Sequence, residues 1–108
     1  MRTIGKFKLS NQGGFVAKLQ FSYIDQDGER QHKDGTGNIL LGQSETADPG
    51  DYGVPDGAMV ALYVFVVWGT DNLANQMFTY KKGSPETADY TISGTTLSNH
   101  LGLTGVTS

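Results

Sequence analysis

The feature that most constrains the fold is an uninterrupted apolar segment, 58-AMVALYVFVVW-68. It is too short for a membrane-spanning helix, which needs about 20 apolar residues. Its β-branched and aromatic residues favour a strand, and a strand that is apolar on both faces is typically covered on each side. We therefore predict a central strand over 58–68.

A second segment, 14-GFVAKLQFSYI-24, alternates between apolar and polar residues, which is the pattern of a half-buried strand. The turn 25-DQDG-28 follows, with Gly28 free to take a positive φ, and it leads into a polar edge strand over 29–33. The same reasoning predicts the remaining elements, which are strands at 37–42, 76–82 and 88–94 and loops at 43–57 and 69–75.

Short strands, 15 glycines and no convincing helix indicate an all-β protein. We predict an antiparallel two-sheet β-sandwich that is immunoglobulin-like in appearance. The length of 108 residues fits a single domain over 1–108. Its last segment, 102-GLTGVTS-108, is expected to be a flexible tail.

The charge and the absence of cysteine exclude several classes of partner and site. A net charge of −3 and a pI near 5.1 argue against nucleic acid, because phosphate binding needs a basic surface. Without cysteine there are no disulfides, thiolate metal sites or cysteine nucleophiles. The segment 1-MRTIGKFKLS-10 has no apolar region of a signal peptide. We expect a soluble protein that is cytoplasmic or secreted by a non-classical route.

Catalytic and metal-binding patterns are not found in the sequence. There is no serine nucleophile elbow and no phosphate-binding glycine loop before a helix. His32 and His100 have no ligand-like spacing. The acidic loop 45–56 could hold calcium through Asp48, Asp51 and Asp56, but a solvated loop is the favoured interpretation. We expect a protein that is not an enzyme and has no cofactor or metal.

Four segments together resemble a known family; they are 13-GGFVAKLQFSY-23, 67-VWGTDN-72, 78-FTYKK-82 and 90-YTISGTTL-97. Their order is similar to that of the C-terminal β-sandwich domain of the cholesterol-dependent, thiol-activated cytolysins. The family closes this domain on the segment I-W-G-T-T-L, which 92-ISGTTL-97 matches at five of six positions. The resemblance extends from about Lys6 to Leu101.

The resemblance implies a membrane-binding module whose Thr-Leu pair recognises a sterol, here Thr96 and Leu97. The predicted ligand- or membrane-binding site comprises Thr95, Thr96, Leu97, Leu73 and Asn72. The family's Cys- and Trp-containing loop is replaced by 69-GTDNLANQM-77, and the nearby Trp68 is expected to end a strand. One exposed leucine contributes roughly 1.5 to 3 kcal/mol on burial. Binding by one domain is therefore expected to be weak, and a homo-oligomer would supply avidity. The family's pore-forming domains are missing, so this chain alone is not expected to form pores.

Two interpretations remain open for Leu97. It caps the bottom of the sandwich while the threonines complete a ladder, or it points outward at a ligand.

Two alternatives to sterol binding also stay open. A glycan-binding lectin would use polar contacts from Asn72, Asn75 and Asn99, together with a tyrosine stripe of Tyr52, Tyr63 and Tyr80. A structural or assembly protein would instead use an exposed sheet edge. The partner is thus a membrane sterol or a surface glycan in the first two hypotheses, and not a nucleic acid.

Overall fold

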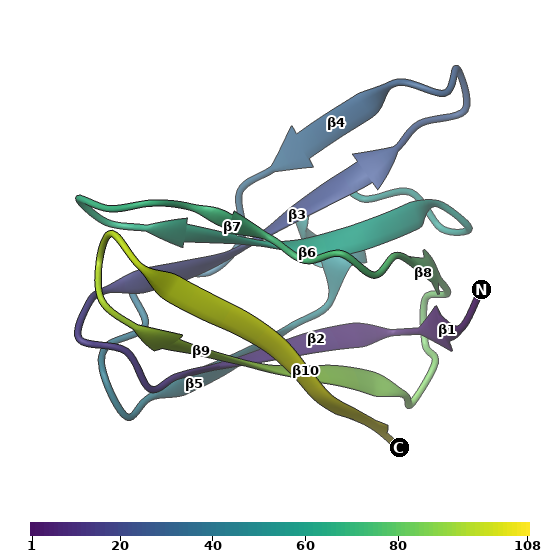
Figure 1. Ribbon diagram of the computed structural model, residues 1–108. Coiled ribbons are helices and arrows are strands. Elements are labelled where there is room, and N and C mark those ends of the chain that lie inside the picture. The colour runs from purple at the N-terminus through teal and green to yellow at the C-terminus, as the bar shows by residue number, and fades with distance from the viewer.

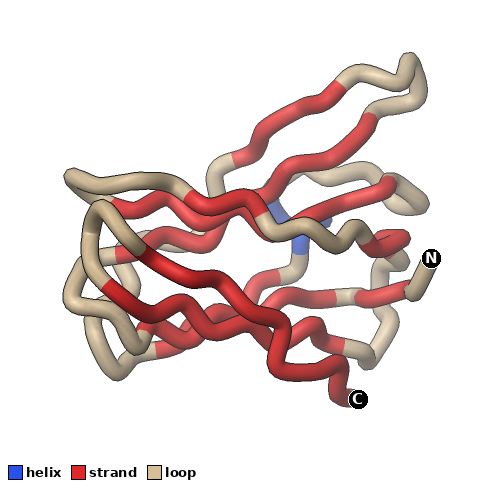
Figure 2. Tube along the Cα trace, in the orientation of Figure 1, coloured by secondary structure: helices blue, strands red, loops and turns tan.

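The apolar pattern is realised as ten strands and one 3-10 helix in a computed structural model that describes all residues from 1 to 108 (Figure 1). The strands are β1 (Thr3–Ile4), β2 (Lys6–Asn11), β3 (Ala17–Ile24), β4 (Arg30–Lys33), β5 (Ser44–Ala47), β6 (Met59–Val66), β7 (Asn72–Leu73), β8 (Phe78–Tyr80), β9 (Thr87–Gly94) and β10 (Asn99–Thr107), and the helix is η1 (Pro49–Tyr52). Figure 2 shows how fully strands dominate the trace. None of the helical structure reaches the length and hydrophobicity that a bilayer crossing requires.

The strands form two sheets that pack face to face. One sheet has the order β1-β8-β6-β3-β4, with β7 also paired to β6, and the other has the order β10-β9-β2-β5. This confirms the predicted all-β two-sheet sandwich. The pairing is not purely antiparallel, because β1 lies parallel to β8 and β2 lies parallel to β9.

Both parallel pairings involve the first residues of the chain, for which the sequence pattern predicted no strand. The chain contributes β1 to one sheet and β2 to the other, and it crosses between them at Gly5. Gly5 is buried, and a β-carbon there would lie 2.1 Å from the backbone oxygen of Ser84. The crossing therefore needs a residue without a side chain at this position.

The core lies between the sheets and contains 21 buried apolar residues. The predicted alternation of β3 is confirmed, since Leu19, Phe21 and Tyr23 all face the core. Phe7 of β2 lies opposite them, with its ring centroid 6.2 Å from that of Phe21 and 5.9 Å from that of Phe78. Contacts of this kind between the two sheets define the register of the sandwich.

The apolar segment 58–68 forms the central strand β6, as predicted, but only one of its faces is fully covered. Val60, Leu62, Val64 and Val66 are buried in the core. The alternate residues lie on the outer face of the sheet, where Phe65 is exposed. No second layer covers that face, so the expectation that both faces are covered was wrong.

Three other predictions from the sequence need correction. The segment 37–42 is not a strand, and only Ile39 forms a bridge, to Ala17. The strand β5 lies instead inside the predicted loop 43–57, paired to β2. The expected tail at 102–108 belongs almost entirely to β10, which pairs with β9 along its length. Leu101 and Val106 pack against the core, and this burial holds the glycine-rich strand in place.

Candidate functional site

Four loops come together at one end of the sandwich, and we call this end the tip. It consists of residues 12–16, 40–43, 67–70 and 95–98, and it lies on the left in Figure 1. The register explains why they meet. The end of β2 at Asn11 lies beside Ile92 near the end of β9, while Ala17 at the start of β3 pairs with Val66 at the end of β6.

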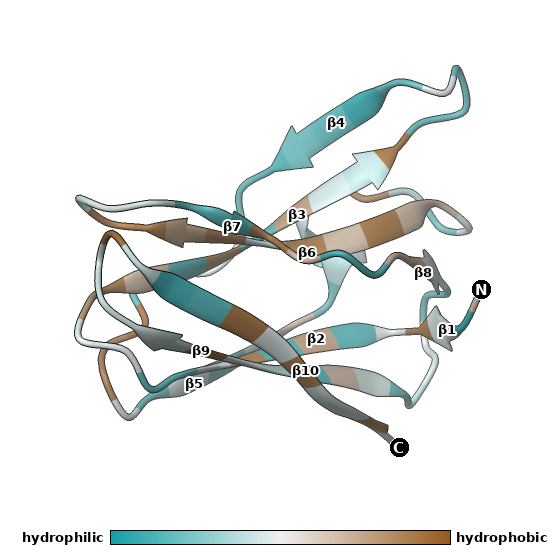
Figure 3. Cartoon of the chain, in the orientation of Figure 1, coloured by the Kyte–Doolittle hydropathy of each residue, from teal (hydrophilic) through white to brown (hydrophobic).

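The tip is uncharged and apolar. None of its residues is Asp, Glu, Lys or Arg. Four of its side chains are large, hydrophobic and open to solvent: Trp68 is 94% exposed, Leu97 76%, Leu41 61% and Leu40 48%. Figure 3 shows hydrophobic colouring on these loops. An exposed apolar cluster of this kind marks an interaction surface more often than isolated exposed leucines do.

The opposite end of the molecule is charged. Its loops, 25–29, 48–58 and 81–86, contain six acidic residues other than Glu86 and the basic residues Lys81 and Lys82. The two ends of the sandwich therefore differ sharply in character, and only the tip could leave water without burying a charge.

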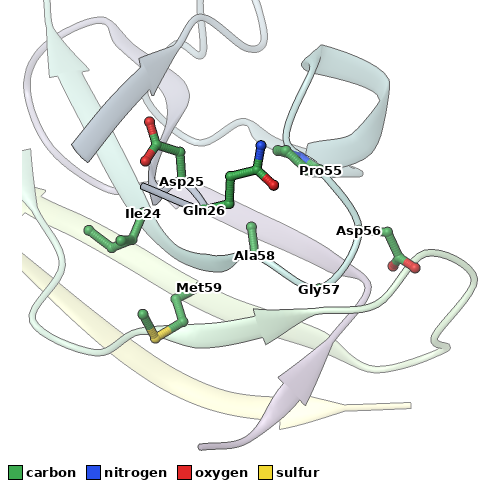
Figure 4. Close-up of a pocket in the computed structure, with 8 residues that line it drawn as sticks. All are labelled: Ile24, Asp25, Gln26, Pro55, Asp56, Gly57, Ala58 and Met59. Atoms are coloured by element: carbon green, nitrogen blue, oxygen red, sulfur yellow. The ribbon is translucent and has the colours of Figure 1, made fainter. Parts of the chain in front are cut away.

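The charged end contains a hollow of about 460 Å³ (Figure 4). Its lining residues are Ile24, Asp25, Gln26, Pro55, Asp56, Gly57, Ala58 and Met59. The carboxylate of Asp25 accepts hydrogen bonds from the backbone N–H groups of Asp27 and Glu29 and from Gln31 Nε2. The bond from Gln31 is the main reason that the pKa of Asp25 lies below its usual value. Asp56 accepts a bond from the backbone of Lys82, so both acids stabilise turns.

Hydrogen bonds fasten two of the tip loops to each other. The backbone N–H of Thr70 donates to the carbonyl of Thr96 over 2.8 Å. Asn99 Nδ2 donates to the carbonyl of Thr70 over 2.8 Å, and its Oδ1 accepts from Asn72 Nδ2 over 2.9 Å. Gly69 packs so closely that a β-carbon would lie 2.2 Å from the backbone oxygen of Thr96. The loops of Trp68 and Leu97 thus behave as one unit.

Asp71 fixes the base of the loop that presents Trp68. Its Oδ1 accepts a hydrogen bond from the backbone N–H of Val66 over 2.9 Å, and its Oδ2 accepts one from the Tyr63 hydroxyl over 2.5 Å. Burial, followed by this contact with Asp71, raises the pKa of Tyr63 to about 12. Trp68 itself has a φ of 60°, in the left-handed region that non-glycine residues rarely adopt.

Asn11 anchors the other two tip loops. It is completely buried, and its Nδ2 donates to the carbonyls of Phe15 and Ile39 over 2.7 and 2.9 Å. Its Oδ1 accepts from the backbone N–H of Gly13, and its own carbonyl accepts from Gly42. One side chain therefore connects the 12–16 loop to the segment that carries Leu40 and Leu41.

Of the residues predicted for the binding site, three lie at the tip. Leu97 is exposed and does not cap the core, so its side chain points outward. Thr95 closes its turn, since its Oγ1 accepts a hydrogen bond from the backbone N–H of Ser98. Thr96 lies between them and is partly exposed.

The other two predicted site residues lie elsewhere. Leu73 pairs with Tyr63 on the outer face of the six-stranded sheet, away from the tip loops. Asn72 Nδ2 donates a hydrogen bond to Asn99 Oδ1, so the side chain of Asn72 is used within the protein. The sequence pattern did not predict Trp68, Leu40 and Leu41 as exposed tip residues, because it favoured strands at these positions. The signal for the two leucines was their adjacency, because neighbouring side chains of a strand point to opposite faces and cannot both be buried on the same face.

The tyrosine stripe and the acidic loop do not form sites. Tyr80 is buried and donates its hydroxyl proton to Asp48, whereas Tyr52 packs against Phe21 and Tyr63 faces the outer side of the sheet. The three rings therefore do not share a surface. No group of three or more His, Asp or Glu side chains is arranged to hold a metal ion.

Comparison with known proteins gives a match in fold. No protein-family model and no curated protein matches the chain. A crystal structure of listeriolysin O matches 96% of this chain with a TM-score of 0.53 and 20% sequence identity. The chain has the fold of a cytolysin domain. The structural resemblance inferred from 92-ISGTTL-97 is thereby confirmed.

Two structures of pneumolysin show the same cytolysin fold. One, at 1.98 Å resolution, matches 92% of this chain with a TM-score of 0.50 and 12% identity. The other, described as the sugar-binding protein pneumolysin, matches 96% with a TM-score of 0.50 and 13% identity. This chain spans only 22% of the listeriolysin O chain and 23% of each pneumolysin chain. At such identities the likeness is one of fold.

Proposed function

We propose that this protein is a membrane-binding module that contacts a bilayer through its tip. The observation that carries the proposal is the pairing of four exposed hydrophobic side chains with the complete absence of charge across the four tip loops. Burying such a surface in lipid removes apolar area from water and does not bury a charged group. The resemblance to the membrane-binding cytolysin domain points to the same end of the same fold.

The number of apolar side chains makes shallow binding energetically feasible. Each of Trp68, Leu97, Leu40 and Leu41 would contribute roughly 1.5 to 3 kcal/mol if fully buried. Partial insertion and the loss of side-chain freedom reduce this sum to the range of a single acyl anchor, whose association constant is about 10⁴ M⁻¹. Binding is therefore weak and reversible for one copy. Trp68 adds an indole, a group that favours the membrane–water interface.

A sterol is the ligand that the tip fits best. Thr95 uses its hydroxyl within its own turn, whereas no hydrogen bond within the chain occupies the hydroxyl of Thr96. A hydroxyl beside an exposed leucine offers a polar contact for a sterol hydroxyl and an apolar contact for its ring system. Such recognition is binding without catalysis, so the protein acts as a non-enzymatic module.

Vesicle sedimentation tests the proposal. Wild-type protein is mixed with phosphatidylcholine vesicles that contain or lack cholesterol and is compared with Trp68→Ala, Leu97→Ala and Met59→Ala. Met59 is also an exposed hydrophobic residue, but it lies at the charged end, so it serves as the matched control. We expect pelleting by wild type and Met59→Ala with cholesterol, and a loss of several-fold in each tip variant. Equal pelleting by all four proteins contradicts the proposal.

A surface glycan is a second candidate ligand for the same end. The favouring observation is the nearly complete exposure of the Trp68 ring, since exposed indoles stack on sugars, together with the fold match to pneumolysin described as a sugar-binding protein. A glycan array separates the candidates. Binding to a sugar, competed by the free sugar and independent of lipid, favours the glycan over the sterol.

A further inference from the structure

We infer that the edge of β10 is a pairing site for the same edge of a second copy of this chain, which closes a symmetric dimer. Exposed strand edges are templates for pairing, and proteins protect them with charge, proline or short length. The edges of this sandwich differ greatly in how they are protected. Pairing of this edge does not require the proposed membrane function.

The other edge strands are short or charged. β4 has four residues and carries Arg30 and Lys33, and β5 has four residues and carries Glu45. β1 and β7 have two residues each. By contrast β10 has nine residues, no Asp, Glu, Lys, Arg or Pro, and only His100 as a titratable group. It is the one long edge without a formal charge.

The free side of β10 also has unused backbone groups. Its ladder to β9 uses one side of the strand, and no backbone group of residues 100–107 bonds to a turn, a loop or another strand. At its start, Asn99 is held by Asn72 and Thr70, so the available region begins after that residue. The bulge at Thr104, between Leu103 and Gly105, interrupts the edge before the strand ends at Thr107. The regular run is therefore 100–103.

A second copy fits this run in only one simple way. Directly opposed residues of an antiparallel pair face the same side of the sheet, so a two-fold axis passes through a residue position. An axis at Gly102 places Leu101 of one copy opposite Leu103 of the other. Both leucines lie on the core side of β10, where Leu103 is partly exposed in one copy and becomes covered by pairing. This pairing brings no two like charges together, because β10 has no formal charge.

The partner strand comes from a second copy of this chain, because β10 is the only edge that is both long and without a formal charge. A chain that pairs two different edges head to tail builds a ring or an open filament, whereas an edge that pairs with itself closes as a two-fold dimer. Since β4, β5, β1 and β7 are short or charged, only the second arrangement is available. The product is a continuous eight-stranded sheet made from the two four-stranded sheets.

Cross-linking tests the register directly, because the natural chain has no cysteine. Across the proposed axis the two Gly102 Cα atoms would lie about 4.5 to 5.5 Å apart, a separation that a disulfide can span. Gly102→Cys is therefore expected to form a covalent dimer under mild oxidation. The matched control is Gly105→Cys, which lies on the same strand with equally open space around its β-carbon but has no counterpart across the axis.

Analytical ultracentrifugation provides the second measurement. Wild type is expected to dimerise with rising concentration, and Leu103→Lys, which brings a charge to the paired edge, is expected to stay monomeric while unfolding at the wild-type temperature. Three results would overturn the inference: wild type that is monomeric up to its solubility limit, equal cross-linking of both cysteine variants, or a dimer that Leu103→Lys leaves unchanged.

Discussion

The backbone N–H of Thr70 donates to the carbonyl of Thr96 over 2.8 Å, and this bond joins the loop that presents Trp68 to the loop that presents Leu97. The two loops follow strands of different sheets, β6 and β9. The two most exposed hydrophobic side chains of the chain are therefore held at a fixed separation before any ligand arrives. Such preorganisation reduces the entropy cost of binding.

The side chain of Asn99 reinforces this connection, so Asn99→Ala should loosen it although the Thr70–Thr96 bond remains. The substitution removes hydrogen bonds to Thr70 and Asn72, each of which contributes about 1 kcal/mol. We expect the free energy of unfolding to fall by about 1 to 2 kcal/mol and cholesterol-dependent vesicle pelleting to weaken, although both apolar anchors remain. Urea denaturation and sedimentation measure the two effects. Asn75→Ala, in an exposed loop position, serves as the control and should change neither.

Trp68 occupies a strained position, which suggests that its indole is kept for binding rather than for stability. A left-handed φ costs a non-glycine residue about 1 to 2 kcal/mol, and glycine adopts it freely. Trp68→Gly should therefore unfold at the same temperature as wild type or a few degrees higher, while losing vesicle binding. Trp68→Ala retains the strain and should gain no stability. A large destabilisation by Trp68→Gly, measured by thermal unfolding, would mean that the indole packs on the protein.

Two tyrosine hydroxyls that are hydrogen-bonded to aspartates predict a loss of stability at alkaline pH. Burial, and then hydrogen bonds to Asp71 and Asp48, raise the pKa values of Tyr63 and Tyr80 to about 12 from an ordinary value of 10.0. Below the ordinary value both residues are protonated in the folded and unfolded states, and the stabilisation is complete. Between that value and about 12 only the unfolded state loses the protons, so the free energy of unfolding falls as pH rises.

Urea denaturation at a series of pH values up to about 12 measures this slope. Tyr63→Phe and Tyr80→Phe should each make the decline shallower. A slope that neither substitution changes would assign the alkaline sensitivity to other groups.

The proposed dimer has a consequence for membranes that follows from its geometry. β10 starts at the tip, so antiparallel pairing points the two tips in opposite directions. Such a dimer gains no avidity on one bilayer but can bridge two. The disulfide-linked Gly102→Cys dimer should therefore make cholesterol-containing vesicles aggregate, measured as turbidity, and reduction should reverse it. Vesicle binding without aggregation would argue against opposed tips.

The strands that could be predicted from the sequence are those whose buried residues form a local apolar pattern. The strand β3 was predicted because its apolar residues recur at every second position, and β6 because it is an uninterrupted apolar run rich in β-branched and aromatic residues. Residues 102–108 were expected to be a tail because they end the given sequence and contain two glycines, which have low strand preference, whereas contacts of Leu101 and Val106 with the core hold β10 in place. Such long-range burial has no local signal.

The site was only partly predictable for a related reason. Leu97 was recognised through a short motif, but the motif could not tell whether the side chain faced the core or the solvent. Trp68 continued an apolar run and was assigned to its strand, whereas the hydrogen bonds of Asp71 end the strand just before it. That four separate uncharged loops meet at one end depends on sheet topology, which the sequence pattern did not resolve.

Trp68 is the only tryptophan of the chain, so its fluorescence reports directly on the tip. The most direct test of membrane contact is to titrate the wild-type protein with cholesterol-containing phosphatidylcholine vesicles while recording its emission, and to repeat the titration with brominated acyl chains. We predict a blue shift on binding and quenching by bromine near the interface. Protein that pellets with vesicles while its emission stays unshifted and unquenched would bind through another surface and would contradict the account.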